Sequence, residues 1–171
     1  IVVGEIRDLE TAENAIRASL TGRLLLATLH ASTASGTITR LIDMKIGRDL
    51  IAYSLTGIIN QRLVRKICPD CREEYRPPQK VLQSLALEAG GGIYHGRGCK
   101  SCKQSGFSGR VGIFGIVTID DEIKRMIIDG ASEPDIKKAT IKKGANGILE
   151  DGLRKIREGI TTPEEIIKAS S

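Results

Sequence analysis

Four cysteines in two CxxC pairs constrain this chain more than any other feature of its sequence. Cys68 and Cys71 form the first pair, Cys99 and Cys102 form the second, and the chain has no other cysteine. The CxxC spacing lets two thiolates of one tight turn reach the same tetrahedral ion, and four thiolates complete its coordination sphere. We therefore predict a structural zinc site, in which the metal holds the fold together and takes no part in chemistry.

Two other uses of the cysteines are weighed against zinc. Two disulfides are usual in a secreted protein, which would normally begin with a signal peptide, whereas this chain begins with the apolar residues Ile1-Val2-Val3. A redox CxxC normally occurs singly, near a βαβ pattern. His95 lies close to Cys99 and could replace a thiolate, but the four cysteines already complete the site. Zinc is the interpretation that the spacing favours.

Composition narrows the class of protein without choosing a function. The 171 residues are 40% hydrophobic but only 3% aromatic, without Trp, so a core must be built from Ile, Leu, Val and Ala. The net charge of +5 is mild, and is compatible with nucleic acid, with acidic lipid headgroups or with no charged partner. No apolar run approaches the length of a membrane span. Reduced cysteines and the absence of a targeting segment indicate a cytoplasmic protein.

The first 29 residues predict a β–α–β unit. Residues 1–3 form a short apolar strand, residues 9–20 place apolar side chains at helical spacing, and residues 23–29 are apolar at nearly every position. Such a unit is the crossover of a parallel sheet, and the second strand is expected to be covered on both faces. Because natural chains rarely start in a strand without Met, we expect a fragment of a longer protein.

Glu5 and His30 each come just after one of these strands. The carboxyl ends of parallel strands are where ligands bind in α/β sheets, so the two side chains are expected to lie near one another. From the residues alone, simpler interpretations compete with a catalytic one. Glu5 would be a solvated loop residue or a helix cap, and His30 a hydrogen-bonding loop residue.

The rest of the chain predicts helices with a small β region between them. We expect helices over residues 36–46 and 49–61, a strand over 62–67, a helix over 81–89, a short strand over 93–95 and a hairpin within 107–119. Four further helices are expected to begin at 120 or 121, 132, 148 and 162. The last of them opens with a capping box, Thr162 to Glu165.

Six segments in order along the chain carry recognisable motifs: residues 3–12, 21–31, 39–44, 61–69, 96–99 and 150–155. Together they resemble the secretion-superfamily ATPases, which power type II secretion and type IV pilus assembly. The first segment looks like the second half of Walker B and the second is similar to the histidine box. The resemblance implies a C-terminal fragment that starts within Walker B. It also implies an α/β fold in three parts. These are a partial RecA-like P-loop ATPase domain with a parallel sheet and crossover helices (1–67), a tetracysteine zinc-binding subdomain with a hairpin (68–119) and a C-terminal helical bundle (120–171).

The resemblance also implies roles for individual residues and for partners. Glu5 matches the Walker B glutamate, which acts on the magnesium-bound or attacking water, and His30 matches the histidine that senses the γ-phosphate of ATP. Arg7 would pair with a phosphate or with a neighbouring loop. The family implies Mg²⁺ and ATP as cofactors of the full-length protein. It also implies a cytoplasmic homo-hexamer at the face of the inner membrane, docked on secretion or pilus platform proteins, with no direct contact to nucleic acid.

The sequence contains no GxxxxGK[ST] motif, so the loop that cradles phosphates is absent from these residues. We therefore predict that the 171 residues alone do not hydrolyse ATP, since the β- and γ-phosphates have no cradle. The alternative function is a zinc-ribbon module that binds nucleic acid or protein. Such a module should place Arg97, Lys100, Lys103 and Arg110 on one face without balancing acids. A redox protein is a third hypothesis, which a zinc assay would exclude.

Three cations, Arg62, Arg65 and Lys66, lie on the approach to the first CxxC pair. The simpler interpretation is a solvated face or pairing with Glu73 and Glu74. The resemblance adds a second one, contact with ATP bound to a neighbouring subunit or with a partner in the membrane complex.

Overall fold

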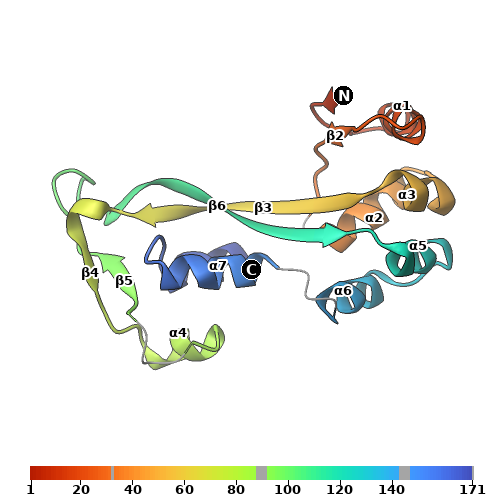
Figure 1. Ribbon diagram of the computed structural model, residues 1–171. Coiled ribbons are helices and arrows are strands. Elements are labelled where there is room, and N and C mark those ends of the chain that lie inside the picture. The colour runs from red at the N-terminus through yellow and green to blue at the C-terminus, as the bar shows by residue number, and fades with distance from the viewer. Residues whose placement is uncertain (32, 88–91, 143–146, 171) are drawn as a thin grey trace. The chain divides into compact units, whose positions relative to one another are not determined.

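The computed structural model describes residues 1–31, 33–87, 92–142 and 147–170, and the chain divides into two compact units (Figure 1). Unit 1 comprises Ile1–Asn60 and Ile116–Ala145, and unit 2 comprises Gln61–Gly115 and Asn146–Ser171. Each unit is therefore assembled from two stretches of chain that are far apart in the sequence. Among the described residues, no helix is long and apolar enough to cross a membrane.

Unit 1 begins with the predicted β–α–β unit. Strand β1 pairs in parallel with β2, with Val2 opposite Leu26 and Val3 opposite Ala27, and helix α1 connects them. The elements of unit 1 that lie outside the long strands are β1 (Val2–Val3), α1 (Leu9–Leu20), β2 (Leu26–Ala27), α2 (Ala34–Asp43), α3 (Arg48–Ser54), α5 (Asp121–Ile128) and α6 (Glu133–Lys142). Helix α1 has the bounds that the apolar spacing predicts.

Isoleucine side chains form the core of unit 1. Ile38 of α2, Ile51 of α3 and the pair Ile123 and Ile127 of α5 are fully or almost fully buried in one apolar cluster. Ile123 and Ile127 are four residues apart and therefore lie on the same face of α5. Helix α5 packs against α3. The Asp120 carboxylate accepts a hydrogen bond from the Ile123 backbone N–H and so fixes where α5 starts.

The expected burial of the second strand is wrong. Residues 23–29 form a strand of only two residues, β2, and the Leu24 and Leu26 residues are 74% and 59% exposed. The parallel sheet of unit 1 consists of β1 and β2 alone within the described residues. An apolar strand is covered on both faces only where further strands and helices surround it. Among the described residues no other strand joins β1 and β2, so apolar side chains of this segment remain exposed.

A long two-stranded sheet joins β3 (Gly57–Ile67) to β6 (Phe107–Thr118), and it corrects two expectations (Figure 1). The predicted helix over 49–61 ends at Ser54, and its last residues belong to β3. The predicted hairpin within 107–119 is a single strand. Ile58 is buried while Ile59 is exposed, which is the alternation of a strand. Its partner lies about 50 residues away in sequence, so local spacing could not reveal it.

Unit 2 surrounds the cysteines with short elements. They are a 3₁₀ turn (Pro69–Cys71), β4 (Arg72–Glu74), α4 (Gln79–Ser84), β5 (Tyr94–Gly96), α7 (Ile148–Arg157) and α8 (Pro163–Ser170). Strands β4 and β5 pair in antiparallel fashion, with Arg72 opposite Gly96 and Glu74 opposite Tyr94. Helix α4 begins two residues before the predicted helix over 81–89 and ends at Ser84, so the prediction is wrong for residues 85–87, which are not helical; residues 88 and 89 lie outside the described residues.

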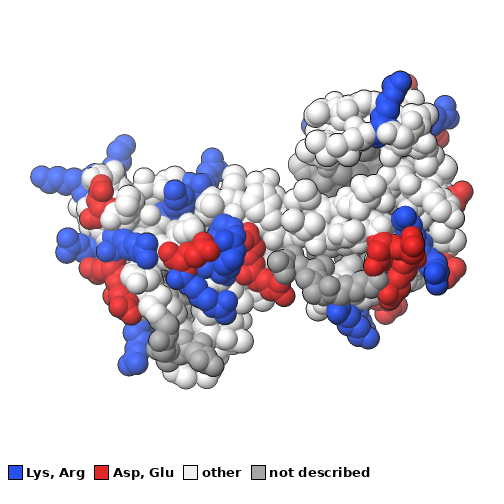
Figure 2. All heavy atoms as spheres, viewed as in Figure 1, with Lys and Arg blue, Asp and Glu red and all other residues white. Residues whose placement is uncertain are grey.

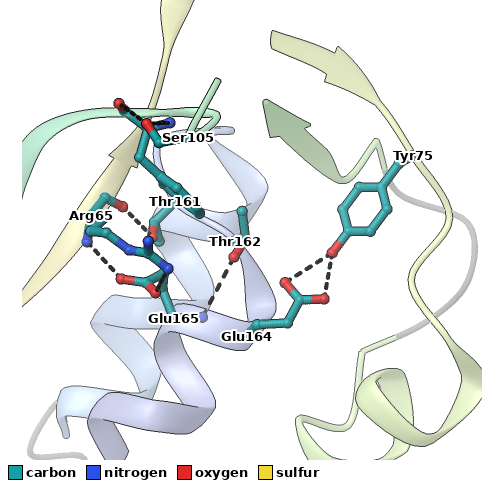
Figure 3. A network of polar contacts seen from close by, with 8 residues as sticks. Arg65, Tyr75, Ser105, Thr161, Thr162, Glu164 and Glu165 are labelled. Atoms are coloured by element: carbon teal, nitrogen blue, oxygen red, sulfur yellow. Dashed lines mark hydrogen bonds and ion pairs between the residues drawn. The ribbon is translucent and has the colours of Figure 1, made fainter. Parts of the chain in front are cut away.

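A polar network ties the start of α8 to strand β3 within unit 2 (Figure 3). The Arg65 guanidinium lies 2.6 Å from Glu165 Oε1, and the Arg65 backbone N–H donates to Glu165 Oε2 at 2.9 Å. The Thr161 hydroxyl donates to the Arg65 carbonyl at 2.8 Å. The predicted capping box is therefore half formed. The Glu165 backbone N–H approaches Thr162 Oγ1 at 3.5 Å, but the Glu165 carboxylate is bonded to Arg65.

Replacing Glu165 by glutamine is expected to destabilise the protein in a pH-dependent way. The hydrogen bond from Arg65 lowers the pKa of the Glu165 carboxyl below its ordinary 4.5, although partial burial opposes this. A lowered folded-state pKa stabilises the fold above pH 4.5, and that stabilisation is lost as the pH falls further. At pH 7 we expect a loss of about 2 kcal/mol, the usual size for a hydrogen bond to a charged group.

Urea denaturation of wild type and Glu165→Gln between pH 7 and pH 3 measures this difference. The matched control is Glu164→Gln, because the neighbouring carboxylate accepts the Tyr75 hydroxyl at the surface, and an amide oxygen can still accept it. A wild-type advantage over Glu165→Gln that does not shrink in acid would contradict the role given to the Arg65–Glu165 pair.

Candidate functional site

The parallel strands of unit 1 bring Glu5 and His30 together. Glu5 follows β1 and His30 follows β2, and the Ile6 backbone N–H donates to the Thr28 carbonyl at 2.9 Å, which extends the contact beyond the paired residues. Glu5 Oε1 lies 3.0 Å from His30 Nε2. The predicted closeness of the two side chains is thus confirmed, and the parallel pairing of the strands is its cause.

Arg7 holds the other oxygen of the same carboxylate. Its Nε donates to Glu5 Oε2 at 2.6 Å, so the arginine and the histidine flank the glutamate from two sides. The hydrogen bond from Arg7 is the main cause that lowers the pKa of Glu5. Burial opposes it, and the charges of Arg7 and His30 lower the pKa further by smaller amounts. The Glu5 carboxylate is therefore an anion at neutral pH, with both oxygens engaged by protein groups.

Accessibility differs sharply among the three residues. The Glu5 side chain is 20% exposed, whereas the His30 side chain is 91% exposed. The imidazole therefore approaches the carboxylate from the solvent side, where it is free to meet a ligand. A carboxylate, an imidazole and a guanidinium at one sheet edge can orient a water molecule and bind the oxygens of a phosphate.

The four cysteines form the second candidate site, at the far end of β3. Their sulfurs all lie within 4.8 Å of one another, and the separations are 3.9 Å for Cys68–Cys99, 3.9 Å for Cys71–Cys102 and 3.6 Å for Cys99–Cys102. Four sulfurs bound to one zinc ion at about 2.3 Å lie about 3.8 Å apart in a tetrahedron. All four are free thiols, so the two disulfides considered from the sequence are not formed. The arrangement fits a tetrahedral metal ion.

Backbone amides point at one of the four sulfurs. The N–H groups of Cys99 and Gly106 donate to Cys102 Sγ at 3.2 and 3.3 Å. Burial disfavours the thiolate of Cys102, but these two N–H groups and the neighbouring thiols outweigh it and lower its pKa to about 6. Burial raises the pKa of Cys71 to about 12. A metal ion bound here would neutralise the negative charge that its thiolate ligands must carry.

Two glycines let the strands around the cysteines approach closely. A Cβ at Gly106 would lie 2.3 Å from the Gly96 carbonyl oxygen, and Gly106 also has a φ of +74°. The Gly106 carbonyl accepts from the Cys68 N–H at 2.9 Å, so this contact places the first CxxC turn against the second. Neither the space nor the backbone conformation at Gly106 suits an L side chain.

Gly106→Ala is expected to reduce metal binding and to destabilise unit 2 by more than about 3 kcal/mol, because backbone atoms must move apart. Gly109→Ala is the matched control. It has a φ of +73° but open space around its Cβ, so it should cost only about 1 kcal/mol of backbone strain. Metal content and thermal unfolding of both variants measure the difference. Equal losses in the two variants would show that the close contact with Gly96 is unimportant.

Other residues that the sequence analysis considered lie elsewhere. His95 Nε2 contacts Glu73 at 3.2 Å and its ring stacks on Tyr75, so His95 is not among the grouped metal ligands. Arg65 pairs with Glu165 and stacks over Phe107, which corrects the expected pairing with Glu73 and Glu74. Residue 32, beside the histidine box, lies outside the described residues.

Residues 1–168 match the model of the family described as Type II/IV secretion system protein. The chain belongs to this family. The sequence resemblance to secretion-superfamily ATPases is thereby confirmed. The four cysteines and the Glu5–His30 pair thus lie within the segment that matches the Type II/IV secretion system proteins.

Curated members of the family with high similarity span both systems. The chain is 43% identical over 172 residues to "Type II secretion system protein E" of Pseudomonas aeruginosa, covering 99% of this chain and 34% of that protein. It is 43% identical over 171 residues to "Type IV pilus assembly ATPase PilB" of Thermus thermophilus, covering 98% of this chain and 19% of that protein. The chain thus spans at most about a third of the length of these relatives.

Two solved structures share the fold of this chain. The pilus retraction motor PilT with bound ADP matches with a TM-score of 0.65 and 26% identity, covering 99% of this chain and 39% of PilT. The ATPase DotB of Legionella pneumophila matches with a TM-score of 0.64 and 21% identity, covering 100% of this chain and 38% of DotB. The second likeness speaks to the fold alone. The chain is therefore an α/β protein that resembles secretion ATPases.

One cluster of hydrogen-bonded polar side chains in unit 1 was not predicted from the sequence. Glu133 of α6 accepts hydrogen bonds from Thr33 and Ser35, which precede or open α2 just after the histidine box. The contact joins residues about 100 positions apart, so no local spacing signals it. The only hint in the sequence is the short run of hydroxyl-bearing residues after His30, which is equally typical of a helix cap.

Proposed function

We propose that this chain is the C-terminal part of a hexameric ATPase that couples ATP hydrolysis to type II protein secretion or type IV pilus assembly. The observation that carries the proposal is the Glu5–His30 contact of 3.0 Å at two adjacent strand ends, in a chain that belongs to the family. Relatives named as a pilus assembly ATPase and as a type II secretion protein support both systems equally.

The three residues at the sheet edge take separate roles in this proposal. Glu5 acts on the attacking or magnesium-bound water, since its carboxylate is anionic at neutral pH. His30 contacts the γ-phosphate, since its ring is open to solvent. Arg7 pairs with a phosphate or with a neighbouring loop, since its guanidinium has further N–H donors besides the Nε–H that holds Glu5. Mg²⁺ supplies charge neutralisation of the phosphates when it is bound.

The cysteine cluster holds a structural zinc ion in this proposal. Cys68, Cys71, Cys99 and Cys102 supply four thiolates, which leave no open position for substrate. The support is the tetrahedral spacing of the sulfurs and the two backbone N–H groups that donate to Cys102. We retain the three-part division proposed from the motifs: a partial RecA-like domain (1–67), a zinc subdomain (68–119) and a C-terminal helical part (120–171).

The proposal extends to the assembly in which the chain works. Residues 1–171 contain no P-loop, so hydrolysis needs a segment beyond them in the full-length protein. We place that protein in the cytoplasm as a homo-hexamer, peripheral at the inner membrane and bound to secretion or pilus platform proteins. This placement rests on the family. It is consistent with the described residues, among which no helix is long and apolar enough to cross a membrane.

The alternative function, a zinc-ribbon module for nucleic acid, has less support. On the face drawn in Figure 2, acidic side chains lie among the basic ones across the part of the molecule that carries unit 2. A nucleic-acid surface would instead gather Lys and Arg without balancing acids, and its affinity would fall steeply with salt.

ATP hydrolysis and binding measurements on two forms of the protein test the proposal. A full-length protein that contains these residues and a P-loop is expected to release phosphate from ATP in the presence of Mg²⁺. Residues 1–171 alone are expected to bind no nucleotide, because the phosphates have no cradle. Saturable micromolar binding of ATP to residues 1–171, or an inactive full-length hexamer, would overturn it.

A further inference from the structure

A carboxylate from helix α6 reaches the start of helix α2 within unit 1. Glu133 Oε1 accepts hydrogen bonds from the Thr33 hydroxyl at 2.7 Å and from the Ser35 hydroxyl at 3.0 Å. Thr33 Oγ1 in turn accepts the Gly36 backbone N–H at 2.9 Å, which caps α2. One acidic side chain therefore fixes both hydroxyl groups at the first turn of this helix.

The cluster is closely packed and electrostatically favourable. Ser35 is buried, and a Cβ at Gly36 would lie 2.9 Å from Thr33 Oγ1 and 3.4 Å from Glu133 Oε1. The glycine therefore leaves room for the Thr33 hydroxyl, while the distance to the carboxylate is close to ordinary van der Waals contact. Because α2 is ten residues long, the positive end of its dipole also favours an anion at its N-terminus.

The cluster lies three residues beyond His30. The His30 side chain is 91% exposed and contacts the Glu5 carboxylate, so the surroundings of the ring do little to hold it in place. His30 lies three residues after β2 and three residues before Thr33, the N-cap residue of α2. Glu133 anchors this N-cap residue.

We propose that Glu133 is a positioning residue that anchors the segment after His30 and so holds the imidazole against Glu5 for ATP hydrolysis. The inference rests on the function proposed above for His30. It has a mechanical consequence, since α6 packs against both α2 and α5. A shift of α6 would be passed to His30 through one carboxylate and two hydroxyl groups.

The test compares three variants of a full-length protein that contains these residues and a P-loop. Glu133→Ala removes the acceptor and is expected to lower kcat about tenfold with KM for ATP changed less than about twofold, because misplacement acts on the transition state. Glu133→Gln keeps an amide oxygen that Thr33 and Ser35 can reach, so it should recover most of kcat. Asp135→Asn is the matched control, because Asp135 lies in the same turn of α6 and accepts the hydroxyl of Ser132, the residue just before the helix.

Hydrogen exchange in the nucleotide-free protein supplies a readout that does not depend on activity. Glu133→Ala should speed exchange in residues 33–37 and leave residues 48–54 of α3 unchanged. His30→Ala separates the two proposals. If it leaves kcat unchanged, the function proposed for His30 fails and this inference fails with it. If it lowers kcat while Glu133→Ala changes neither kcat nor exchange, the positioning role alone is overturned.

Discussion

Replacing Cys68 by alanine is expected to release the metal and to unfold the part of unit 2 between the two CxxC pairs. Cys68 is 1% exposed, and its sulfur lies 3.9 Å from that of Cys99. Structural zinc contributes about 10 kcal/mol or more to the folding of small zinc domains, which exceeds the total stability of most single domains. No substitution elsewhere in unit 2 should have a larger effect.

The large expected effect of Cys68→Ala follows from the lack of apolar packing around the cysteines. The buried set Cys68, Cys71 and Cys102 forms a small cluster of its own, apart from the apolar core of unit 2, and Cys99 packs partly against it. The short strands β4 and β5 pair over only three residues each, which is too little to be stable without support. With the proposed metal bound, metal–sulfur bonds would stabilise this part of unit 2, while apolar packing stabilises the rest of the unit.

Metal analysis and thermal unfolding of purified protein measure this prediction. Wild type should contain one zinc per chain, and Cys68→Ala should contain almost none and should expose residues 68–106 to protease. Ser101→Ala is the matched control, because Ser101 is exposed in the second CxxC turn and has no role in the cluster. A metal-free wild type, or an equally stable Cys68→Ala protein, would contradict a structural metal.

Under the proposed function, replacing Glu5 by glutamine is expected to lower kcat for ATP hydrolysis by the full-length protein at least about 100-fold, the usual contribution of a group that orients or deprotonates a nucleophile. Glutamine keeps the size of the side chain but loses the charge that Arg7 and His30 both contact. ATP affinity should change little, since the cradle for the phosphates lies outside these residues. The loss should therefore appear in the chemical step.

Steady-state phosphate release and the binding of a fluorescent ATP analogue measure the two quantities separately. Glu10→Gln is the matched control, because Glu10 is an exposed carboxylate in the first turn of α1 that has no part in the Glu5 cluster. Glu5→Gln that hydrolyses ATP at more than about a tenth of the wild-type rate would remove Glu5 from the catalytic role proposed for it.

Features that depend on residues close together along the chain could be predicted from the amino-acid sequence. The CxxC spacing predicted the cluster of four cysteines, since each CxxC turn places two sulfurs close enough together to bind the same ion. Apolar spacing gave α1, and the capping residues Asp120 and Ser132 marked the helices that follow them. The parallel crossover from β1 to β2 predicted the closeness of Glu5 and His30, because it fixes which strand ends are adjacent.

Features that join distant parts of the chain could be seen only in the folded structure. Residues 57–61 become strand and not helix because β6 offers a partner about 50 residues later. Glu165 bonds Arg65 in place of its own helix cap, and Glu133 bonds Thr33, in both cases across about 100 residues. Hydrogen-bond partners are chosen by position in space, and periodicity along the chain carries no information about partners so far away.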